Sequence, residues 1–348
     1  MSSLGVWRTL SLLALGITIV LTIAMIFTAG FVHPPLVTEQ VGYRGTGMEQ
    51  IRTRSDIKRL EEANQLPEAI PAADPGGQLA KEAYQNVQVL GDLTVNQFGR
   101  VMVAITNWVA PQQGCAYCHN TDNMADDGIY AKKVARRMLQ MTRHINTDWK
   151  AHVASTGVVC YTCHRGNPVP AYTWFNGMNS PQAGGFSTSN YGLGHPSGPN
   201  GSSALTQDPF PPLNEKSGLI RVQAMQALPN EGPGASIQSA EQVYSLMISF
   251  SHALGVNCTF CHNAQDFGNW ATSRPQRVTA WQGIQMARDL NINYLDPLKD
   301  ILPPHRLGAL GDAPKLNCAT CHQGANKPLL GQSIAKDWPE LGGAPALQ

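Results

Sequence analysis

The chain has 348 residues, of which 43% are hydrophobic and 14% are charged, and its net charge is +1. A chain of this length has room for two or three domains. The apolar content argues against a disordered chain, and the balanced charge argues against a nucleic-acid-binding protein, which needs a basic excess.

The longest apolar stretch lies near the N-terminus. Residues 10–32 are 23 positions without a charged side chain. As a helix they span roughly 34 Å, enough to cross a hydrocarbon core of about 30 Å. We therefore expect an uncleaved transmembrane anchor, with residues 1–9 in the cytoplasm. The alternative is a cleaved signal peptide, although the apolar core of such a peptide is only about 7–15 residues long.

Two further stretches have the composition of loops. Residues 33–78 are expected to form an extended segment, and the three glycines of Gly42–Met48 argue against a helix there. Residues 167–235 are rich in glycine, proline, serine and asparagine, which is typical of a connector. Residues 324–348 are expected to be a C-terminal tail.

All eight cysteines fall in four copies of the pattern Cys-x-x-Cys-His. This pattern attaches haem c: the thiols bond to the porphyrin edge and the adjacent histidine binds the iron. A zinc ribbon or a thioredoxin-like pair does not need a histidine after every second cysteine, or four copies. The motifs predict four covalent haems c and leave no cysteine for a disulfide. They comprise Cys115, Cys118 and His119; Cys160, Cys163 and His164; Cys258, Cys261 and His262; and Cys318, Cys321 and His322.

The motifs form two pairs, within residues 79–166 and 236–323. Each stretch reads as helix, motif, helix, motif, which predicts two repeated dihaem units. Ser239 to Gln242 predict a capping box at the start of the first helix of the second unit. We expect a mainly α-helical fold in which porphyrins fill much of the core and strands are not needed. The first helices carry matching apolar stripes, Phe98, Met102, Ile105 and Val109 in one unit and Val243, Met247, Phe250 and Leu254 in the other.

Methionines on these stripes are candidate distal ligands for the irons. Met102 lies thirteen residues before Cys115, and Met247 lies eleven residues before Cys258. A methionine on a helical stripe is ordinarily a core residue, but its recurrence at one place in both units favours ligation. We assign Met102 to the first haem and Met247 to the third, with His252 as the competing donor for the third.

The second helices differ at one aligned position. Aligning Met141–Asn146 with Met286–Asn291 places Met138 opposite Gly283, so the first unit has a methionine where the second has none. We assign Met138 to the second haem and expect the fourth to take its ligand from elsewhere.

One candidate for the fourth haem lies further along the first unit. His152 follows Met138 by 14 residues, so on a continuous helix it returns within about 40° of the same face. The fourth haem would then be bis-histidine and lower in potential than its methionine-ligated neighbours. Met286 and His144 stay open as alternatives.

The paired motifs, the methionine positions, His152 eight residues before Cys160, and the glycine-rich segment after the anchor resemble the tetrahaem cytochrome c subunit of purple-bacterial photosynthetic reaction centres. The resemblance covers nearly the whole chain. It implies a mainly helical fold with a pseudo-twofold axis between the dihaem units. It also implies four haems c with the axial pairs His119 and Met102, His164 and Met138, His262 and Met247, and His322 and His152. Many members carry a lipidated N-terminal cysteine, whereas this chain resembles those that keep a signal helix.

The implied activity is electron transfer and not catalysis. The resemblance implies that the haems relay electrons from a soluble cytochrome c or high-potential iron–sulfur protein to the photo-oxidised bacteriochlorophyll special pair. The implied partners are the core subunits L, M and possibly H, and the light-harvesting 1 antenna. The implied location is the photosynthetic membrane, with one span and the haem-bearing bulk in the periplasm, where haem c is attached. The alternatives are a membrane-anchored tetrahaem quinol dehydrogenase and a multihaem reductase.

Overall fold

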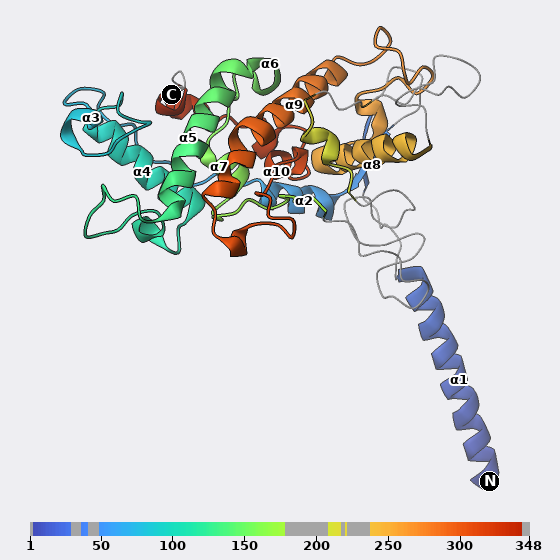
Figure 1. Cartoon of the computed structure of the whole chain (residues 1–348). Helices are drawn as coiled ribbons and strands as arrows, with labels where there is room; N and C mark the ends of the chain where they lie inside the picture. Colours follow the sequence, from blue (N-terminus) through green and yellow to red (C-terminus); the bar gives the residue numbers. More distant parts are fainter. Residues whose placement is uncertain are drawn as a thin grey trace.

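The computed structural model describes residues 3–28, 36–40, 49–177, 208–216, 220 and 237–342. Over these residues the fold is mainly helical, with one two-stranded sheet (Figure 1). The prediction of a mainly α-helical fold is therefore confirmed, whereas the expectation that no strands are needed is wrong for one short hairpin.

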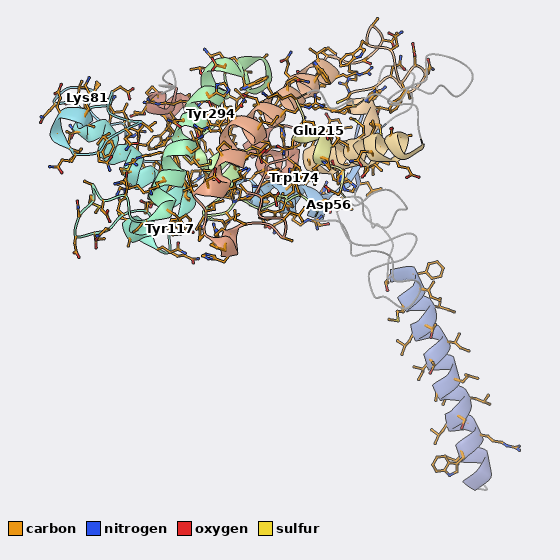
Figure 2. The ribbon with its side chains drawn as sticks, in the orientation of Figure 1. Asp56, Lys81, Tyr117, Trp174, Glu215 and Tyr294 are labelled. Carbon is orange, nitrogen blue, oxygen red and sulfur yellow. A yellow bond between two sulfur atoms is a disulfide. The ribbon has the colours of Figure 1, made fainter. Side chains whose placement is uncertain are left out.

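Helix α1 (Ser3–Thr28) stands apart from the helical body (Figure 1), and its side chains project on all sides of the helix (Figure 2). Its segment Gly5–Thr28 is about 36 Å long and apolar enough to cross a membrane. The predicted N-terminal apolar helix is confirmed, but it begins seven residues before position 10. The last predicted positions, 29–32, lie outside the described residues.

A hairpin and a helix follow where the sequence predicts an extended segment. Strands β1 (Leu36–Gln40) and β2 (Glu49–Thr53) pair in antiparallel orientation, and helix α2 (Arg54–Ala63) follows β2 directly. The predicted non-helical stretch Gly42–Met48 lies outside the described residues. Since the strands are only five residues long, their alternation gives a weak signal in the sequence.

Capping boxes fix where two of the helices begin. Thr53 Oγ1 accepts a hydrogen bond from the Asp56 backbone N–H at 3.0 Å at the start of α2. Thr94 Oγ1 accepts one from the Gln97 N–H at 3.3 Å at the start of α4 (Val95–Val109). Each side chain satisfies an N–H group that has no partner within the helix.

The predicted capping box in the second unit is wrong. Helix α8 spans Ile237–Leu254, so the stretch from Ser239 to Gln242 lies inside the helix and not at its start. The residues before Ser239 continue the helical turn, and a Ser-x-x-Gln pattern inside a helix has no free N-terminus to cap.

The remaining elements follow the order helix, motif, helix, motif in both units. In the first unit they are α3 (Ala80–Ala83), α4, η1 (Gly114–Tyr117), α5 (Tyr130–Asp148), α6 (Lys150–Val153) and α7 (Cys160–His164). In the second they are α8, η3 (Cys258–Phe260), α9 (Gln276–Leu290), η4 (Asn291–Leu295), η5 (Asp296–Asp300), η6 (Pro304–Arg306) and α10 (Cys318–His322). Short 3₁₀ turns outside the units are η2 (Pro211–Leu213), η7 (Pro328–Gly331), η8 (Ala335–Asp337) and η9 (Pro339–Leu341).

A repeated asparagine contact joins the second helix of each unit to the strand-like residues before its second motif. In the first unit, Asn146 exchanges two hydrogen bonds with the backbone of Val158, at 2.9 and 2.8 Å. In the second, Asn291 exchanges two with Leu316, at 3.0 and 2.9 Å. The aligned asparagines therefore make the same pair of backbone hydrogen bonds in both units.

The same asparagines also hold segments from outside the predicted units. Asn146 donates to the carbonyl of Leu341 in η9, and Asn291 donates to that of Leu213 in η2, both at 2.9 Å. The tail thus packs on the first unit and the connector packs on the second. The repeated geometry extends beyond residues 79–166 and 236–323 into η2 and η9.

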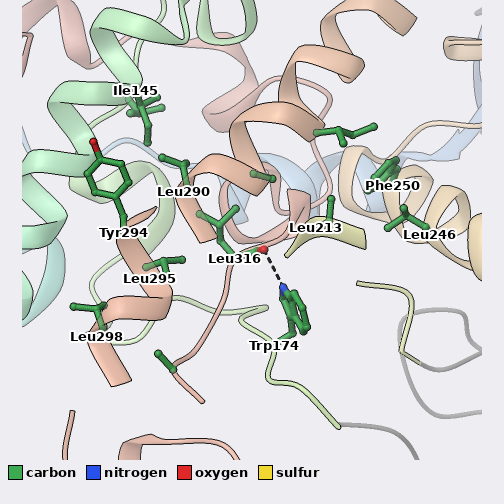
Figure 3. Packing of buried hydrophobic residues seen from close by; sticks show 14 residues of the cluster. Ile145, Trp174, Leu213, Leu246, Phe250, Leu290, Tyr294, Leu295, Leu298 and Leu316 are labelled. Atoms are coloured by element: carbon green, nitrogen blue, oxygen red, sulfur yellow. Dashed lines mark hydrogen bonds between the residues drawn. The ribbon is translucent and has the colours of Figure 1, made fainter. Parts of the chain in front are cut away.

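Two apolar clusters form the core. The larger one gathers residues of α5, α8, α9, η4 and the connector, and the Trp174 indole N–H in it donates to the Leu316 carbonyl at 2.9 Å (Figure 3). The smaller one packs α4 against α5, α7 and the tail, where Trp108 meets Trp338 edge to face. Met138 and Met247 pack against the larger cluster, and Met102 packs against the smaller one.

Candidate haem-binding sites

The four motifs adopt two local conformations, which alternate along the chain. The first and third lie in the 3₁₀ turns η1 and η3, whereas the second and fourth form the one-turn helices α7 and α10. Arg165 and Gln323 end these one-turn helices with the same positive φ of 48°. The backbone then hydrogen-bonds to the first helix of its own unit, from Gly166 N–H to Trp108 O and from Gly324 N–H to Ala253 O, both at 2.8 Å.

All four motif histidines are oriented in the same way. Each Nδ1–H donates to a backbone carbonyl, which leaves the lone pair of Nε2 for a metal. The acceptor lies five residues on in the first and third motifs and three residues on in the other two. The pairs are His119 with Met124 at 3.1 Å, and His164 with Asn167, His262 with Phe267 and His322 with Ala325 at 2.9 Å each. Because these acceptors are backbone atoms, the sequence carries no side-chain signal for them.

Burial favours the uncharged form of several motif side chains. It lowers the pKa of His164 and His262, and it lowers the pKa of His322 to about 4. It also raises the pKa of the Cys160 and Cys318 thiols to about 12. Neutral imidazoles suit an iron ligand. Within the described part of the chain, no three residues among His, Cys, Asp and Glu gather as a metal-ion site.

A large cavity of about 1700 Å³ lies beside α8 and α9 of the second unit, and residues of α5, α6 and α7 from the first unit also line it. Typical small-molecule sites have volumes of about 300–1,000 Å³, so this one has room for two groups of that size. Both motifs of the second unit open into it, and so does the whole predicted stripe of α8. Its lining includes Met247, Cys258, Cys261 and His262, which are the residues predicted for the third haem, and His152, Cys318, Cys321 and His322, which are those predicted for the fourth.

His152 faces His322 across this cavity. The two ring centroids lie 6.0 Å apart. Two metal–nitrogen bonds of about 2 Å each, together with the two ring radii, require roughly this separation. The His152 Nδ1–H donates to the Thr279 carbonyl of α9 at 2.9 Å, so this ring has the orientation of the motif histidines. The structure therefore brings together the two imidazoles of the predicted bis-histidine pair.

The route by which His152 reaches this place differs from the prediction. Helix α5 ends at Asp148, and His152 belongs to the separate one-turn helix α6. The chain breaks at Trp149 and again at Ala154, whose φ of 51° and ψ of −145° lie in a region that residues other than glycine rarely adopt. The expectation of one continuous helix is wrong, because this break turns α6 toward α9.

The alternative donors for the fourth haem are placed differently. His144 Nδ1 lies 2.6 Å from an Asp148 carboxylate oxygen, and its Nε2 lies 2.5 Å from one of Asp289. Both ring nitrogens therefore face acceptors, and neither has a lone pair directed at the cavity. Met286 lines the cavity, as His152 does.

For the third haem, Met247 and His252 lie on different faces of α8. Met247 is half-buried and shares the cavity with His262. His252 is exposed, is not among the lining residues, and makes contacts of its own. This placement favours Met247.

The predicted ligands of the first unit lie on its two long helices. Met102 is half-buried on α4 and packs against the smaller cluster, and Met138 is half-buried on α5 and packs against the larger one. The stripe of α4 lies beside its most buried face, which is formed by Arg100, Val101, Ala104 and Trp108. Each methionine thus sits at the margin of a core.

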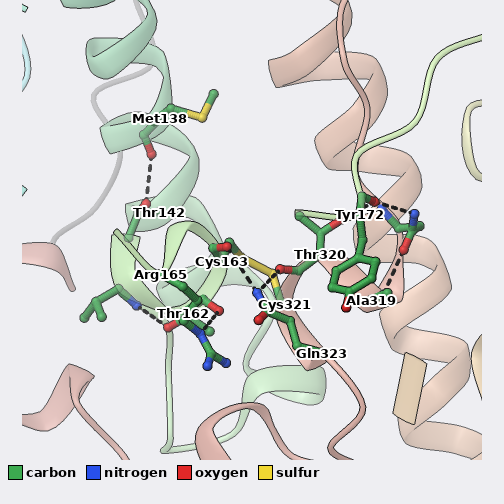
Figure 4. Close-up of a disulfide and its surroundings, with 12 residues drawn as sticks. Met138, Thr142, Thr162, Cys163, Arg165, Tyr172, Ala319, Thr320, Cys321 and Gln323 are labelled. Carbon is green, nitrogen blue, oxygen red and sulfur yellow. Dashed lines mark hydrogen bonds between the residues drawn. A yellow bond between two sulfur atoms is a disulfide. The ribbon is translucent and has the colours of Figure 1, made fainter. Parts of the chain in front are cut away.

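One cysteine pair departs from the sequence prediction. Cys163 and Cys321 form a disulfide between α7 and α10 (Figure 4), although the motifs predict that no cysteine is left for one. The two helices lie against each other, and the Cα atoms of the pair are 4.4 Å apart. A separation of 158 residues hides this proximity from the sequence. Each sulfur forms either this bond or a thioether to haem, so the two states exclude each other.

A family model described as the photosynthetic reaction centre cytochrome c subunit matches residues 32–342. The chain belongs to this family. The photosynthetic reaction center cytochrome c subunit of Rubrivivax gelatinosus is 49% identical over 330 residues, which are 95% of this chain and 90% of the relative. Its counterpart in Thermochromatium tepidum is 47% identical over 92% of this chain and 79% of the relative. That of Roseobacter denitrificans is 42% identical over 87% and 84%.

Membership confirms the family resemblance drawn from the motifs. The chain is a membrane-anchored cytochrome with covalently bound haem, and it is an electron carrier and not an enzyme. The donor chemistry fits this cofactor, because every motif combines two cysteine sulfurs with an imidazole whose Nδ1 is hydrogen-bonded to a carbonyl, which leaves Nε2 to bind iron.

Proposed function

We propose that this chain carries four haems c and passes electrons through them to the photo-oxidised special pair of a reaction centre. The observation that carries the proposal is the common orientation of the four motif histidines, each with Nδ1 tied to a carbonyl and Nε2 left for iron. Haem iron supplies the chemistry, since it accepts and releases one electron without making or breaking a bond in a substrate.

The proposed axial ligands follow the two units. His119 with Met102 and His164 with Met138 serve the first two haems, His262 with Met247 serves the third, and His322 with His152 serves the fourth. A methionine sulfur as the second axial ligand raises the reduction potential of a haem iron relative to a second imidazole. The cavity shared by Met247 and His262, and the opposed rings of His152 and His322, support the last two assignments.

In the mature protein we assign all eight cysteine sulfurs to thioether bonds. Cys163 and Cys321 then belong to the second and fourth haems, and their disulfide belongs to a chain without haem. The close approach of α7 and α10 supports an arrangement in which the second and fourth haems would lie near each other, which would suit transfer between the units.

The two dihaem units are proposed to be related by a pseudo-twofold axis. The matching asparagine contacts, the matching ends of α7 and α10, and the matching docking of η2 and η9 support this relation. The proposed units are residues 79–166 and 236–323, joined by the connector 167–235 and followed by the tail 324–348.

The proposed setting is the photosynthetic membrane. Helix α1 crosses it with residues 1–9 in the cytoplasm, and the haem-bearing body lies in the periplasm, against the L and M subunits and possibly H, near the light-harvesting 1 antenna. A soluble cytochrome c or high-potential iron–sulfur protein supplies the electrons. The apolar, outward-facing surface of α1 supports the membrane assignment.

Three measurements on the purified, haem-loaded chain test this proposal. Intact mass should show four haem increments, and near-infrared magnetic circular dichroism should show three His/Met irons and one His/His iron. The reduced protein should not bind carbon monoxide, because every iron has two protein ligands. Fewer than four haems, or a native iron that binds carbon monoxide, would overturn the assignment and favour a reductase.

A further inference from the structure

Gly283 lies on α9 directly beneath the ring of His152. A Cβ atom at position 283 would lie 2.5 Å from Cε1 of that ring, 2.9 Å from Nδ1 and 3.1 Å from Nε2. Contacts below 3 Å are too close for carbon atoms to tolerate. The imidazole therefore occupies the space that any side chain at 283 would take.

The ring has little freedom to move away. Its Nδ1–H is bound to the carbonyl of Thr279, one helical turn before Gly283, at 2.9 Å. Its other side faces His322. The helix that carries it is a single turn that ends at Ala154 in a strained backbone conformation. A side chain at 283 would have to displace a ring that is hydrogen-bonded to α9 and carried by this short helix.

Position 283 also has a counterpart in the first unit. Asn291 and Asn146 make the same backbone contacts in their units. Asn291 lies eight residues after Gly283, and Asn146 lies eight residues after Met138. Gly283 therefore corresponds to Met138. One unit carries a methionine at this position, and the other carries no side chain and receives an imidazole from its neighbour.

We propose that the missing side chain at Gly283 determines the ligand of the fourth haem. Gly283 is a positioning residue: it touches no iron, but it admits His152 to the place that a methionine from α9 would otherwise enter. This inference rests on the proposed pairing of His152 with His322, and it adds the reason why one haem of the four departs from the His/Met pattern.

Two substitutions test it in the haem-loaded chain. Gly283→Ala should displace His152, so that the His/His signature is lost and the reduced fourth haem binds carbon monoxide. Gly283→Met should replace that signature with a fourth His/Met signature and shift the lowest potential upward. Gly99→Ala is the matched control, because Gly99 is also in a helix and has no atom within 4 Å of its ideal Cβ position. It should change none of the four signatures.

His152→Ala distinguishes the role of Gly283 from the assignment of His152 as the ligand. Loss of the His/His signature in His152→Ala, with its retention in both Gly283 variants, would overturn the role of Gly283 and leave the ligand assignment standing. Retention of the signature in His152→Ala would overturn the assignment itself. Haem content and far-ultraviolet circular dichroism establish that each variant is folded. If Gly283→Met fails to accumulate, Gly283→Ala carries the test alone, because it adds one carbon atom.

Discussion

Replacing Asn291 should destabilise the second unit more than any comparable change in the first. The Asn291 side chain is fully buried. It accepts from the Leu316 N–H at 2.9 Å and donates to the carbonyls of Leu316 and Leu213 at 3.0 and 2.9 Å. It thus ties α9 to the connector and to the residues just before Cys318.

The magnitude follows from these three contacts. A hydrogen bond contributes about 0.5–1.5 kcal/mol, and a buried partner left unsatisfied costs about 1–3 kcal/mol. Asn291→Ala removes three bonds and leaves the Leu316 N–H and the Leu213 carbonyl without a partner, whereas the Leu316 carbonyl keeps its bond from Trp174. We therefore expect a loss of about 3–5 kcal/mol. Asn146→Ala removes the equivalent bonds, but Asn146 is only half-buried and water can replace part of them. We expect about 1–2 kcal/mol there.

Guanidinium titration of the full chain in detergent, followed by far-ultraviolet circular dichroism, gives both values against the same wild-type background. Because Leu316 lies two residues before the fourth motif, Asn291→Ala should also perturb the fourth haem before the other three. An equal cost for the two substitutions, or a cost for Asn291→Ala below about 1 kcal/mol, would refute this reasoning.

Three further predictions concern the ligands and the charged groups. Met247→Ala should lower the potential of the third haem alone and let its reduced iron bind carbon monoxide, whereas His252→Ala should change neither; a redox titration of both variants decides, and the opposite pattern would make His252 the ligand. Burial raises the pKa of Asp289, but hydrogen bonds from His144 and its neighbours outweigh this effect and hold the pKa below its ordinary value. The wild type should therefore be more stable than Asp289→Asn at neutral pH, and this difference should fade as the pH falls below about 4, where the carboxylate becomes protonated; a difference that grows toward acid pH would contradict it. Alkylation of the denatured and reduced mature protein should label no thiol, since all eight sulfurs are thioethers, and two labelled thiols would mean that the Cys163–Cys321 disulfide persists.

The sequence predicts most of what depends on side-chain pattern. The four motifs, the apolar stripes of α4 and α8, and the N-terminal apolar helix all follow from spacing and composition. All four residues of the stripe of α8, Val243, Met247, Phe250 and Leu254, line the cavity, as the periodicity requires. The alignment of Met138 with Gly283 also follows from the sequence, although its steric meaning does not.

The features that the sequence misses depend on the backbone or on distant segments. The break at Trp149 separates the short helix of His152 from α5, and the positive φ of Ala154 ends that helix, but neither residue type signals such a conformation in the sequence. The turns η2 and η9 are three residues long and have no periodicity, so their docking on opposite units is invisible before folding. The proximity of Cys163 and Cys321 arises only when α7 meets α10.

Flash-induced absorption changes in photosynthetic membranes test the central claim most directly. After a saturating flash, the photo-oxidised special pair should be re-reduced while a c-type α-band bleaches with the same time course. The bleach should appear when only the higher-potential haems are reduced beforehand, and in Met247→Ala it should show a changed amplitude or rate. Re-reduction of the special pair without any haem oxidation would contradict the account.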